Sequence, residues 1–107
     1  MIQAVYHRKY QTVTVEGHAY SDEPGKDLVC AGVSAIVYTL AANAMQLQEQ
    51  GAVKKADVKL EPGNARIHCK AVSRYKATVT VILDAVCVGL EMLASQYPQY
   101  IRYEIHE

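Results

Sequence analysis

Alternating apolar and polar positions near the start of the chain predict a pair of β-strands. Residues 2–7 and 10–17 both place apolar side chains at every second position. A period of two is typical of a strand with one buried and one exposed face. The polar residues 7–9 between them are short enough for a turn, so we predict that the two segments form a hairpin. The polar stretch that follows, residues 19–26, contains proline and glycine and is expected to be a loop.

A helical spacing of apolar residues replaces the alternation after this loop. Asp27 is a favourable N-cap residue and Gly51 is a plausible C-cap, so a helix is expected between them. Its apolar positions recur every three or four residues and form one stripe. The members of this stripe are Val29, Val33, Ile36, Val37, Leu40, Ala44 and Leu47.

Residues 76–97 are ambiguous by local composition but helical by periodicity. The β-branched run from Thr78 to Ile82 favours a strand. A helical stripe of apolar residues nevertheless continues through the whole stretch, and a period sustained over more than twenty residues outweighs local propensity. We therefore predict a helix that ends before Pro98.

Three further strands complete the expected fold. Val58 and Leu60 mark a short strand, residues 65–71 and 101–106 alternate as longer ones, and a turn over residues 61–64 joins the first two. The order of elements is then ββαββαβ. Because each helix has one apolar stripe and most strands have one apolar face, we predict an α+β fold. A mostly antiparallel five-stranded sheet would carry both helices packed on one face.

The opposite face of this sheet is expected to be polar. Its side chains would be Arg66, His68, Lys70, Arg102 and Glu104. Such a face is either solvated or packed against a partner subunit.

Length and charge narrow the class of protein further. A chain of 107 residues suits one domain, residues 1–107, and half of its residues are hydrophobic. Eleven basic residues balance eleven acidic ones, and a net charge of zero argues against a dedicated nucleic-acid binder. No uninterrupted apolar run approaches the roughly 20 residues of a membrane helix, and the first residues lack the layout of a signal peptide. We therefore expect a cytoplasmic protein.

Cysteine usage gives no sign of a disulfide framework or a metal site. The three cysteines are odd in number and widely spaced. No CxxC or HxxxH pair is present, so no metal and no cofactor is expected, although a scattered site that includes His18 and Cys30 remains open. We expect Cys69 and Cys87 to be buried core residues. Surface positions are expected for the remaining histidines, His7, His68 and His106.

The segment from Gly17 to Ala35 concentrates the residues that could carry chemistry. With Asp27 as the cap, Cys30 is the third residue of the helix, where the positive end of the helix dipole favours the thiolate. Unpaired N–H groups of the first turn could also stabilise an oxyanion. His18 lies at the end of a strand, and the loop is long enough to bring its imidazole to the thiol as an acid and base. A plainer interpretation stays open, in which Cys30 is a small core residue and His18 an exposed histidine.

Four nearby residues could support such a pair. Asp27 either only caps the helix or also orients the imidazole of His18. Ser34 shares the helical face of the cysteine. Gly17 and Gly25 would supply backbone freedom at the strand end and in the loop.

The same residues resemble a family motif. Gly17-His18-Ala19, a short polar loop with a glycine, and then the run DLVCAGVSA from Asp27 to Ala35 resemble the ribosomal-processing cysteine proteases of Firmicutes and related bacteria. The His, Asp, Cys and Ser of the motif keep their relative places. Chain length, the order of elements, and a closing helix followed by Tyr97-Pro98 and an alternating strand also fit. The resemblance therefore covers essentially the whole chain.

The resemblance implies an activity and a set of site residues. The family's motif positions fall on the catalytic residues His18 and Cys30 and on Gly17, Asp27 and Ser34. The family removes the N-terminal extension of large ribosomal subunit protein twenty-seven, cleaving after an aromatic residue. The resemblance also implies that the chain is a homodimer without a cofactor. It further implies a flexible loop that corresponds to about residues 19–26. The implied partners are a ribosomal protein substrate and a second copy of the chain, with no direct contact to nucleic acid or membrane.

Two alternatives from other classes remain. A non-catalytic, ribosome-associated binding module would use the polar sheet face, and changes on that face would abolish its association. A redox-sensing thiol protein would use Cys30, with Cys69 or Cys87 as a resolving partner. Peptide cleavage that is lost in a Cys30→Ala variant would distinguish the protease from both.

Overall fold

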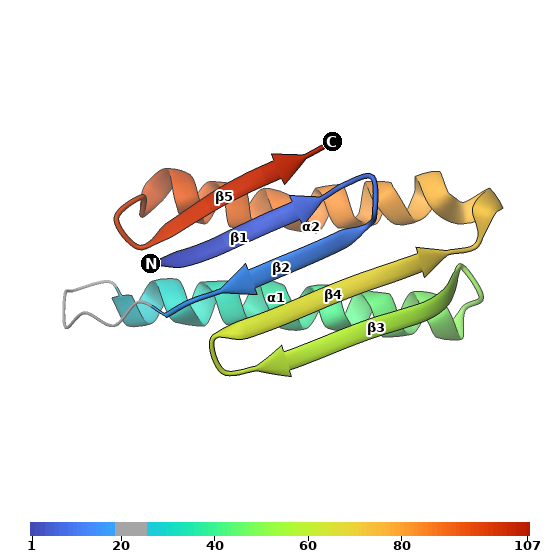
Figure 1. The fold of residues 1–107 in the computed structure, drawn as a ribbon, viewed down its shortest axis with the longest axis horizontal. Helices are drawn as coiled ribbons and strands as arrows, with labels where there is room; N and C mark the ends of the chain where they lie inside the picture. The colour runs from blue at the N-terminus through green and yellow to red at the C-terminus, as the bar shows by residue number, and fades with distance from the viewer. Residues whose placement is uncertain (19–25) are drawn as a thin grey trace.

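The computed structural model describes residues 1–18 and 26–107, which form a sheet layer and a helix layer (Figure 1). The order of elements is ββαββαβ, and the prediction of an α+β fold is confirmed. The expected loop over residues 19–26, including Gly25, falls almost entirely outside the described residues. The bounds are β1 Ile2–His7, β2 Thr12–Glu16, α1 Lys26–Glu49, β3 Val53–Glu61, β4 Asn64–Ala71, a 3-10 turn Ser73–Tyr75, α2 Lys76–Gln96 and β5 Ile101–His106.

The five strands form one sheet in the order β3-β4-β2-β1-β5. The pairs β3–β4, β4–β2 and β2–β1 are antiparallel, and β1–β5 is parallel. The prediction of a mostly antiparallel sheet is therefore confirmed, with the parallel pair joining the two ends of the chain. These directions make β2 and β3 parallel across α1, and β4 and β5 parallel across α2. Each helix is thus a crossover connection between two strands that run the same way.

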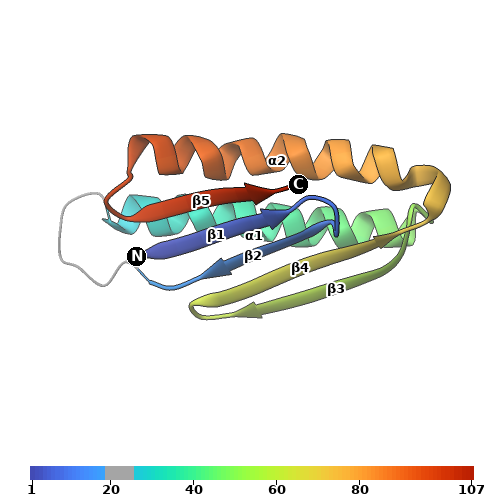
Figure 2. The ribbon, with the colours of Figure 1, turned by 45° about the horizontal axis from the view of Figure 1, so that its top comes forward.

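Both helices lie on the same side of the sheet (Figures 1 and 2). Their apolar stripes meet the inner side chains of all five strands in one core. Gly32 of α1 faces Leu93 of α2, and Gly89 of α2 faces Ile36 of α1, so the two helices approach closely at glycines. The largest fully buried side chains include Tyr6, Leu40, Ile67, Leu83, Leu90 and Ile101.

The turn between β1 and β2 is longer than the sequence pattern predicts. Residues 8–11 form it, so Tyr10 and Gln11 do not belong to the strand. Gln11 has a left-handed backbone with φ +49° and is almost fully buried. Its side-chain amide donates to the carbonyl oxygen of Lys76 at 3.0 Å and to Thr80 Oγ1 at 2.8 Å. The alternation of side chains cannot reveal this turn, because backbone hydrogen bonds and the contacts of Gln11 with α2 hold it.

Strand β3 is also longer than predicted, at nine residues. It lies at the edge of the sheet, and most of its side chains are exposed. An exposed edge strand needs no apolar alternation, and its lysines, such as Lys54 and Lys55, discourage pairing with other chains. For this reason the apolar pattern marked only the part around Val58 and Leu60.

Only the C-terminal end of α1 matches the prediction. At the C-terminal end, Gly51 has φ +84°, its N–H donates to the carbonyl oxygen of Gln48 at 3.1 Å, and Ala52 N–H donates to that of Leu47 at 2.9 Å. This is a Schellman motif, and the predicted C-cap is confirmed. At the N-terminal end the helix begins at Lys26, so Asp27 lies inside the first turn and is not the N-cap.

Both helices are long and apolar enough, by length and composition alone, to cross a membrane: Asp27–Glu49, and Ser73–Gln96 with the 3-10 turn included. The sequence expectation considered only uninterrupted apolar runs and therefore overlooked them. In the structure each helix packs one stripe into the core, as core helices of soluble proteins also do. Length and composition are thus weak evidence for membrane contact.

Buried thiols and an outer polar face agree with the sequence expectations. Cys69 and Cys87 are each 1% exposed, and no cysteine is in a disulfide. His106 is exposed, while His7 and His68 are half-buried on the outer face of the sheet. His68 Nδ1 is 2.7 Å from Thr12 Oγ1. The charged side chains of that face are exposed: Arg66, Lys70, Arg102 and Glu104.

Candidate active site

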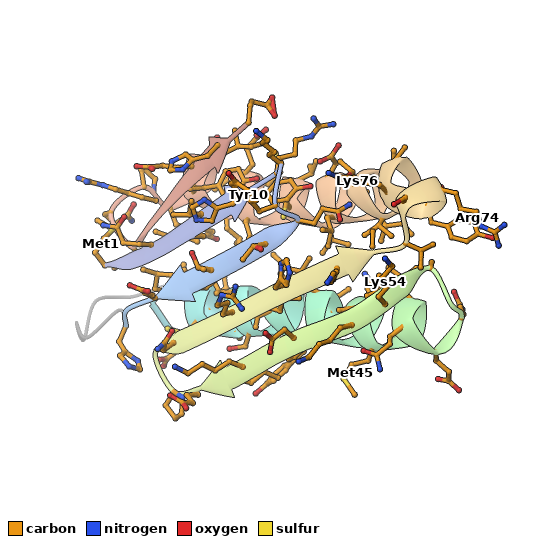
Figure 3. All side chains as sticks on the ribbon, turned by 45° about the vertical axis from the view of Figure 1, so that its right-hand side comes forward. Met1, Tyr10, Met45, Lys54, Arg74 and Lys76 are labelled. Atoms are coloured by element: carbon orange, nitrogen blue, oxygen red, sulfur yellow. The ribbon has the colours of Figure 1, made fainter. Side chains whose placement is uncertain are left out.

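A cavity of about 290 Å³ opens where the end of β2, the first half of α1 and the β3–β4 turn meet. Met1 lies at this end of the molecule and Arg74 at the opposite end (Figure 3). The residues that line the cavity are Ile2, Val15, Gly17, His18, Cys30, Val33, Ser34, Val37, Tyr38, Leu60, Glu61, Pro62, Gly63, Asn64 and Ala65.

Four of the predicted site residues meet at this cavity: Gly17, His18, Cys30 and Ser34. His18 follows the last residue of β2 by two positions, and Cys30 lies near the start of α1 and is half-buried. An imidazole and a half-buried thiol thus line the same cavity, and these are the two groups that nucleophilic catalysis by cysteine uses. Asp27 is exposed and is not among the residues that line the cavity.

Cys30 lies slightly deeper in the helix than the sequence predicts. Because α1 begins at Lys26, Cys30 is its fifth described residue and not its third. The N–H groups of a helix's first four residues have no acceptor inside the helix and carry its positive end. The cysteine therefore lies at the boundary of the electropositive turn, with the unpaired N–H groups one turn before it.

His18 is fixed by backbone contacts on both sides. The N–H of Gly17 donates to the carbonyl oxygen of Gly63 at 2.9 Å, which ties the end of β2 to the β3–β4 turn. The ammonium group of Met1 donates to the carbonyl oxygen of His18 at 2.9 Å. Gly17 has φ +99°, and a Cβ there would collide with the carbonyl oxygen of Met1, so this position requires glycine.

The rest of the cavity is mainly apolar. Buried aliphatic side chains from β1, β2, α1 and β4 form its base: Ile2, Val15, Val33, Val37 and Ala65. Tyr38 and Leu60 line it as well but remain 63% and 44% exposed. A base of this kind beside a thiol suits an apolar or aromatic side chain next to the reacting bond.

The β3–β4 turn is the part of the site that sequence reasoning missed. Residues 61–64 were expected only to connect two strands, yet all of them line the cavity. The Pro62-Gly63 pair predicts a turn with a left-handed glycine, and Gly63 has φ +72°. Which part of the molecule such a turn touches depends on the pairing of β4 with β2, which no local pattern reveals.

The two other thiols are unsuited to nucleophilic chemistry. Burial raises the pKa of Cys69 to about 11 and the pKa of Cys87 to about 12. Both are therefore protonated at neutral pH, and both are closed off from solvent. The described residues also contain no group of three or more His, Cys, Asp or Glu side chains placed to hold a metal ion.

The family model described as "Cysteine protease Prp" matches residues 1–102 of the chain. Relatives of the chain include proteins that carry the name "Ribosomal processing cysteine protease Prp". The protein of Staphylococcus aureus (strain NCTC 8325 / PS 47) is 27% identical over 94 residues, which cover 88% of this chain and 85% of the relative. The protein of Mycoplasma pneumoniae (strain ATCC 29342 / M129 / Subtype 1) is 30% identical over 99 residues, covering 89% and 87%.

Several solved structures share the fold, among them the two that follow. The essential ribosomal processing protease Prp from S. aureus, in complex with a covalently linked product peptide, superposes with a TM-score of 0.74 at 24% identity. That match covers 99% of this chain and all of the other. SMU.848 from Streptococcus mutans superposes with a TM-score of 0.68 at 27% identity, covering 98% and 93%.

Proposed function

The chain belongs to the cysteine protease Prp family and is a cysteine protease, and we propose that Cys30 is its nucleophile and His18 its general acid and base. One observation carries this assignment: His18, just after β2, and Cys30, in the following helix α1, line the same cavity. The burial of Cys69 and Cys87 supports it, because it leaves Cys30 as the accessible thiol.

The chemistry follows from the roles of these two groups. The imidazole of His18 accepts the thiol proton, and the thiolate of Cys30 attacks the carbonyl carbon of the scissile peptide bond. N–H groups at the start of α1 stabilise the negative charge that develops on the carbonyl oxygen. His18 then donates its proton to the departing amine, which leaves a thioester. Water, deprotonated by His18, hydrolyses the thioester and regenerates the thiol.

The supporting residues have narrower roles in this scheme. Gly17 lets β2 end against Met1, so that the next residue turns into the cavity. Asp27 places a carboxylate in the first turn of α1, where a negative charge stabilises the helix. Ser34 lines the cavity beside Cys30 and can contact the bound peptide.

The proposed substrate is the N-terminal extension of large ribosomal subunit protein twenty-seven, cleaved after an aromatic residue. The names of the relatives support a ribosomal protein as the target. The apolar base of the cavity supports an aromatic residue before the scissile bond. As a processing enzyme for a ribosomal protein, the chain is expected to work in the cytoplasm, as a homodimer, without a cofactor.

Membership of a protease family favours catalysis over the two alternatives. A binding module would not need an accessible thiol and an imidazole in one cavity. A redox sensor that uses a resolving cysteine would need a second reactive thiol, but Cys69 and Cys87 are both buried. The polar sheet face remains available for contacts with a partner, and such contacts are compatible with proteolysis.

Replacement of the thiol tests the assignment. Cys30→Ala is expected to abolish cleavage of a peptide that spans the extension junction, measured by mass spectrometry of the products. Cys69→Ala is the matched control and is expected to retain cleavage if the variant folds. In the wild-type protein at neutral pH, iodoacetamide is expected to modify Cys30 much faster than Cys69 or Cys87. Undiminished cleavage by Cys30→Ala would reject the mechanism.

A further inference from the structure

We propose that Gly63, in the turn between β3 and β4, is a positioning residue that holds the His18 imidazole in its catalytic place, a role that rests on the Cys30–His18 mechanism above. Gly63 lies outside the family motif of residues 17–35. It acts through His18 and has no chemistry of its own.

The imidazole lies directly against the backbone of Gly63. A Cβ built on Gly63 would collide with the His18 ring: it would lie 2.6 Å from Cε1 and 2.7 Å from Cδ2, and closer still to Nε2. Real Cβ atoms do not approach other heavy atoms this closely, so any side chain at this position must displace the ring. The imidazole therefore packs directly against the Cα of Gly63, in the space that a side chain would fill.

The same turn also holds the backbone that carries the imidazole. The carbonyl oxygen of Gly63 accepts the N–H of Gly17 at 2.9 Å, and Asn64 pairs in register with Glu16 of β2. The two-residue turn Pro62-Gly63 thus contacts both the ring of His18 and the backbone N–H of Gly17, the residue before it. Because the turn is anchored in the sheet, the imidazole is positioned by a rigid element.

The contact with His18 explains why position 63 requires glycine. The backbone conformation alone would not require it. Gly63 has φ +72°, a region that asparagine also adopts in many turns. Gly51 has a similar φ of +84°, but a Cβ there would meet nothing within 4 Å. The two glycines differ in one respect that matters here, which is the presence of the His18 ring.

This difference provides a matched experiment. Gly63→Ala and Gly51→Ala both place alanine in a left-handed conformation, and Gly63→Ala also pushes the imidazole away. Small misplacements of catalytic groups can lower rates by about 100-fold, so we expect kcat of Gly63→Ala to fall by about 10- to 100-fold relative to Gly51→Ala. KM is expected to change less than kcat, because Gly63→Ala adds only one methyl group to the cavity lining.

Two readouts separate positioning from a general effect on the fold. In nuclear magnetic resonance spectra, the Cε1–H signal of His18, assigned with His18→Ala, is expected to shift in Gly63→Ala and not in Gly51→Ala. In a His18→Ala background, Gly63→Ala is expected to cause no further loss of kcat. If the alanine variant at position 63 does not fold, Gly63→Asn and Gly51→Asn form the second pair, because asparagine tolerates this backbone better.

The outcomes distinguish this role from the mechanism on which it rests. A kcat for Gly63→Ala equal to or above that of Gly51→Ala would overturn the positioning role, even if Cys30→Ala is inactive. Full activity of Cys30→Ala or His18→Ala would instead overturn the catalytic assignment itself.

Discussion

Asp84 on α2 joins two residues of the first strand and turn through its carboxylate. Tyr6, which is fully buried, donates its hydroxyl to Oδ1 at 2.8 Å, and Arg8 Nε and Nη2 donate to Oδ1 and Oδ2 at 3.0 and 3.1 Å. The hydrogen bond from Arg8, with help from that of Tyr6, holds the pKa of Asp84 below its usual range. Burial and the neighbouring carboxylate raise the pKa of Tyr6.

The lowered pKa of Asp84 predicts how stability depends on pH. A carboxyl group with a pKa lower in the folded than in the unfolded state contributes stability above its unfolded value of about 3.9, and loses it as the pH falls through the folded value. Asp84→Asn is expected to lower the free energy of unfolding at pH 7 by about 1 kcal/mol, a small figure because both charged side chains are partly exposed. Urea denaturation of the wild-type protein and of Asp84→Asn from pH 7 to 2.5 measures this difference. The free energies of unfolding of the two proteins should converge below about pH 4. A constant difference over this range would contradict the prediction.

Also at the scale of single residues, the sequence could suggest candidate catalytic residues but not their surroundings. His18 and Cys30 could be proposed from residue type, position at element ends and the family motif. Gly63, Tyr38 and Leu60 could not, because they reach the cavity through strand pairing and helix packing between distant segments. Asp27 shows the opposite error, since a residue suited to a helix cap lies one residue inside the helix boundary.

The crossing of α1 and α2 is set by small residues. A Cβ on Gly89 would lie 2.9 Å from Cδ1 of Ile36, closer than two carbon atoms pack. Alanine stabilises a helix interior by about 1 kcal/mol relative to glycine, but overpacking costs typically 1–3 kcal/mol. Gly89→Ala is therefore expected to lower the free energy of unfolding by about 1 kcal/mol.

A double variant tests whether this one contact is responsible. Ile36→Val removes Cδ1, so Gly89→Ala in that background is expected to be neutral or stabilising in urea denaturation. If Gly89→Ala is equally harmful in both backgrounds, the close contact with Ile36 does not set the helix crossing.

Among the elements, predictability follows burial. Both helices and the inner strands bury one side, and this burial imposes a period that can be read from the residues. The edge strand β3 and the turn at residues 8–11 are held by backbone pairing and by Gln11, so the apolar pattern carries little information about them. The parallel pairing of β5 with β1 likewise has no local signature.

Within the described residues, the outer face of α2 offers an apolar surface for the proposed second copy of the chain. Val81, Val88 and Met92 share one side of the helix and are 64%, 53% and 49% exposed. Homodimers bury faces that are more apolar than ordinary protein surface. Val88→Glu is expected to convert a dimer to a monomer in sedimentation velocity, with the helical circular dichroism unchanged. A wild-type chain that sediments as a monomer would refute the proposed dimer.

Pairing of Ile2 with Ile101 has a consequence for the order in which the molecule can assemble. Every residue that lines the cavity lies between positions 2 and 65, so all of the site residues are synthesised before the last third of the chain. Strand β1, however, keeps one hydrogen-bonding edge unpaired until the last strand arrives, and contacts of such long sequence separation slow folding. A nascent chain therefore holds all of the proposed catalytic groups before its sheet is complete. We accordingly expect proteolysis to begin only after the C-terminal strand has left the translating ribosome and paired with the first.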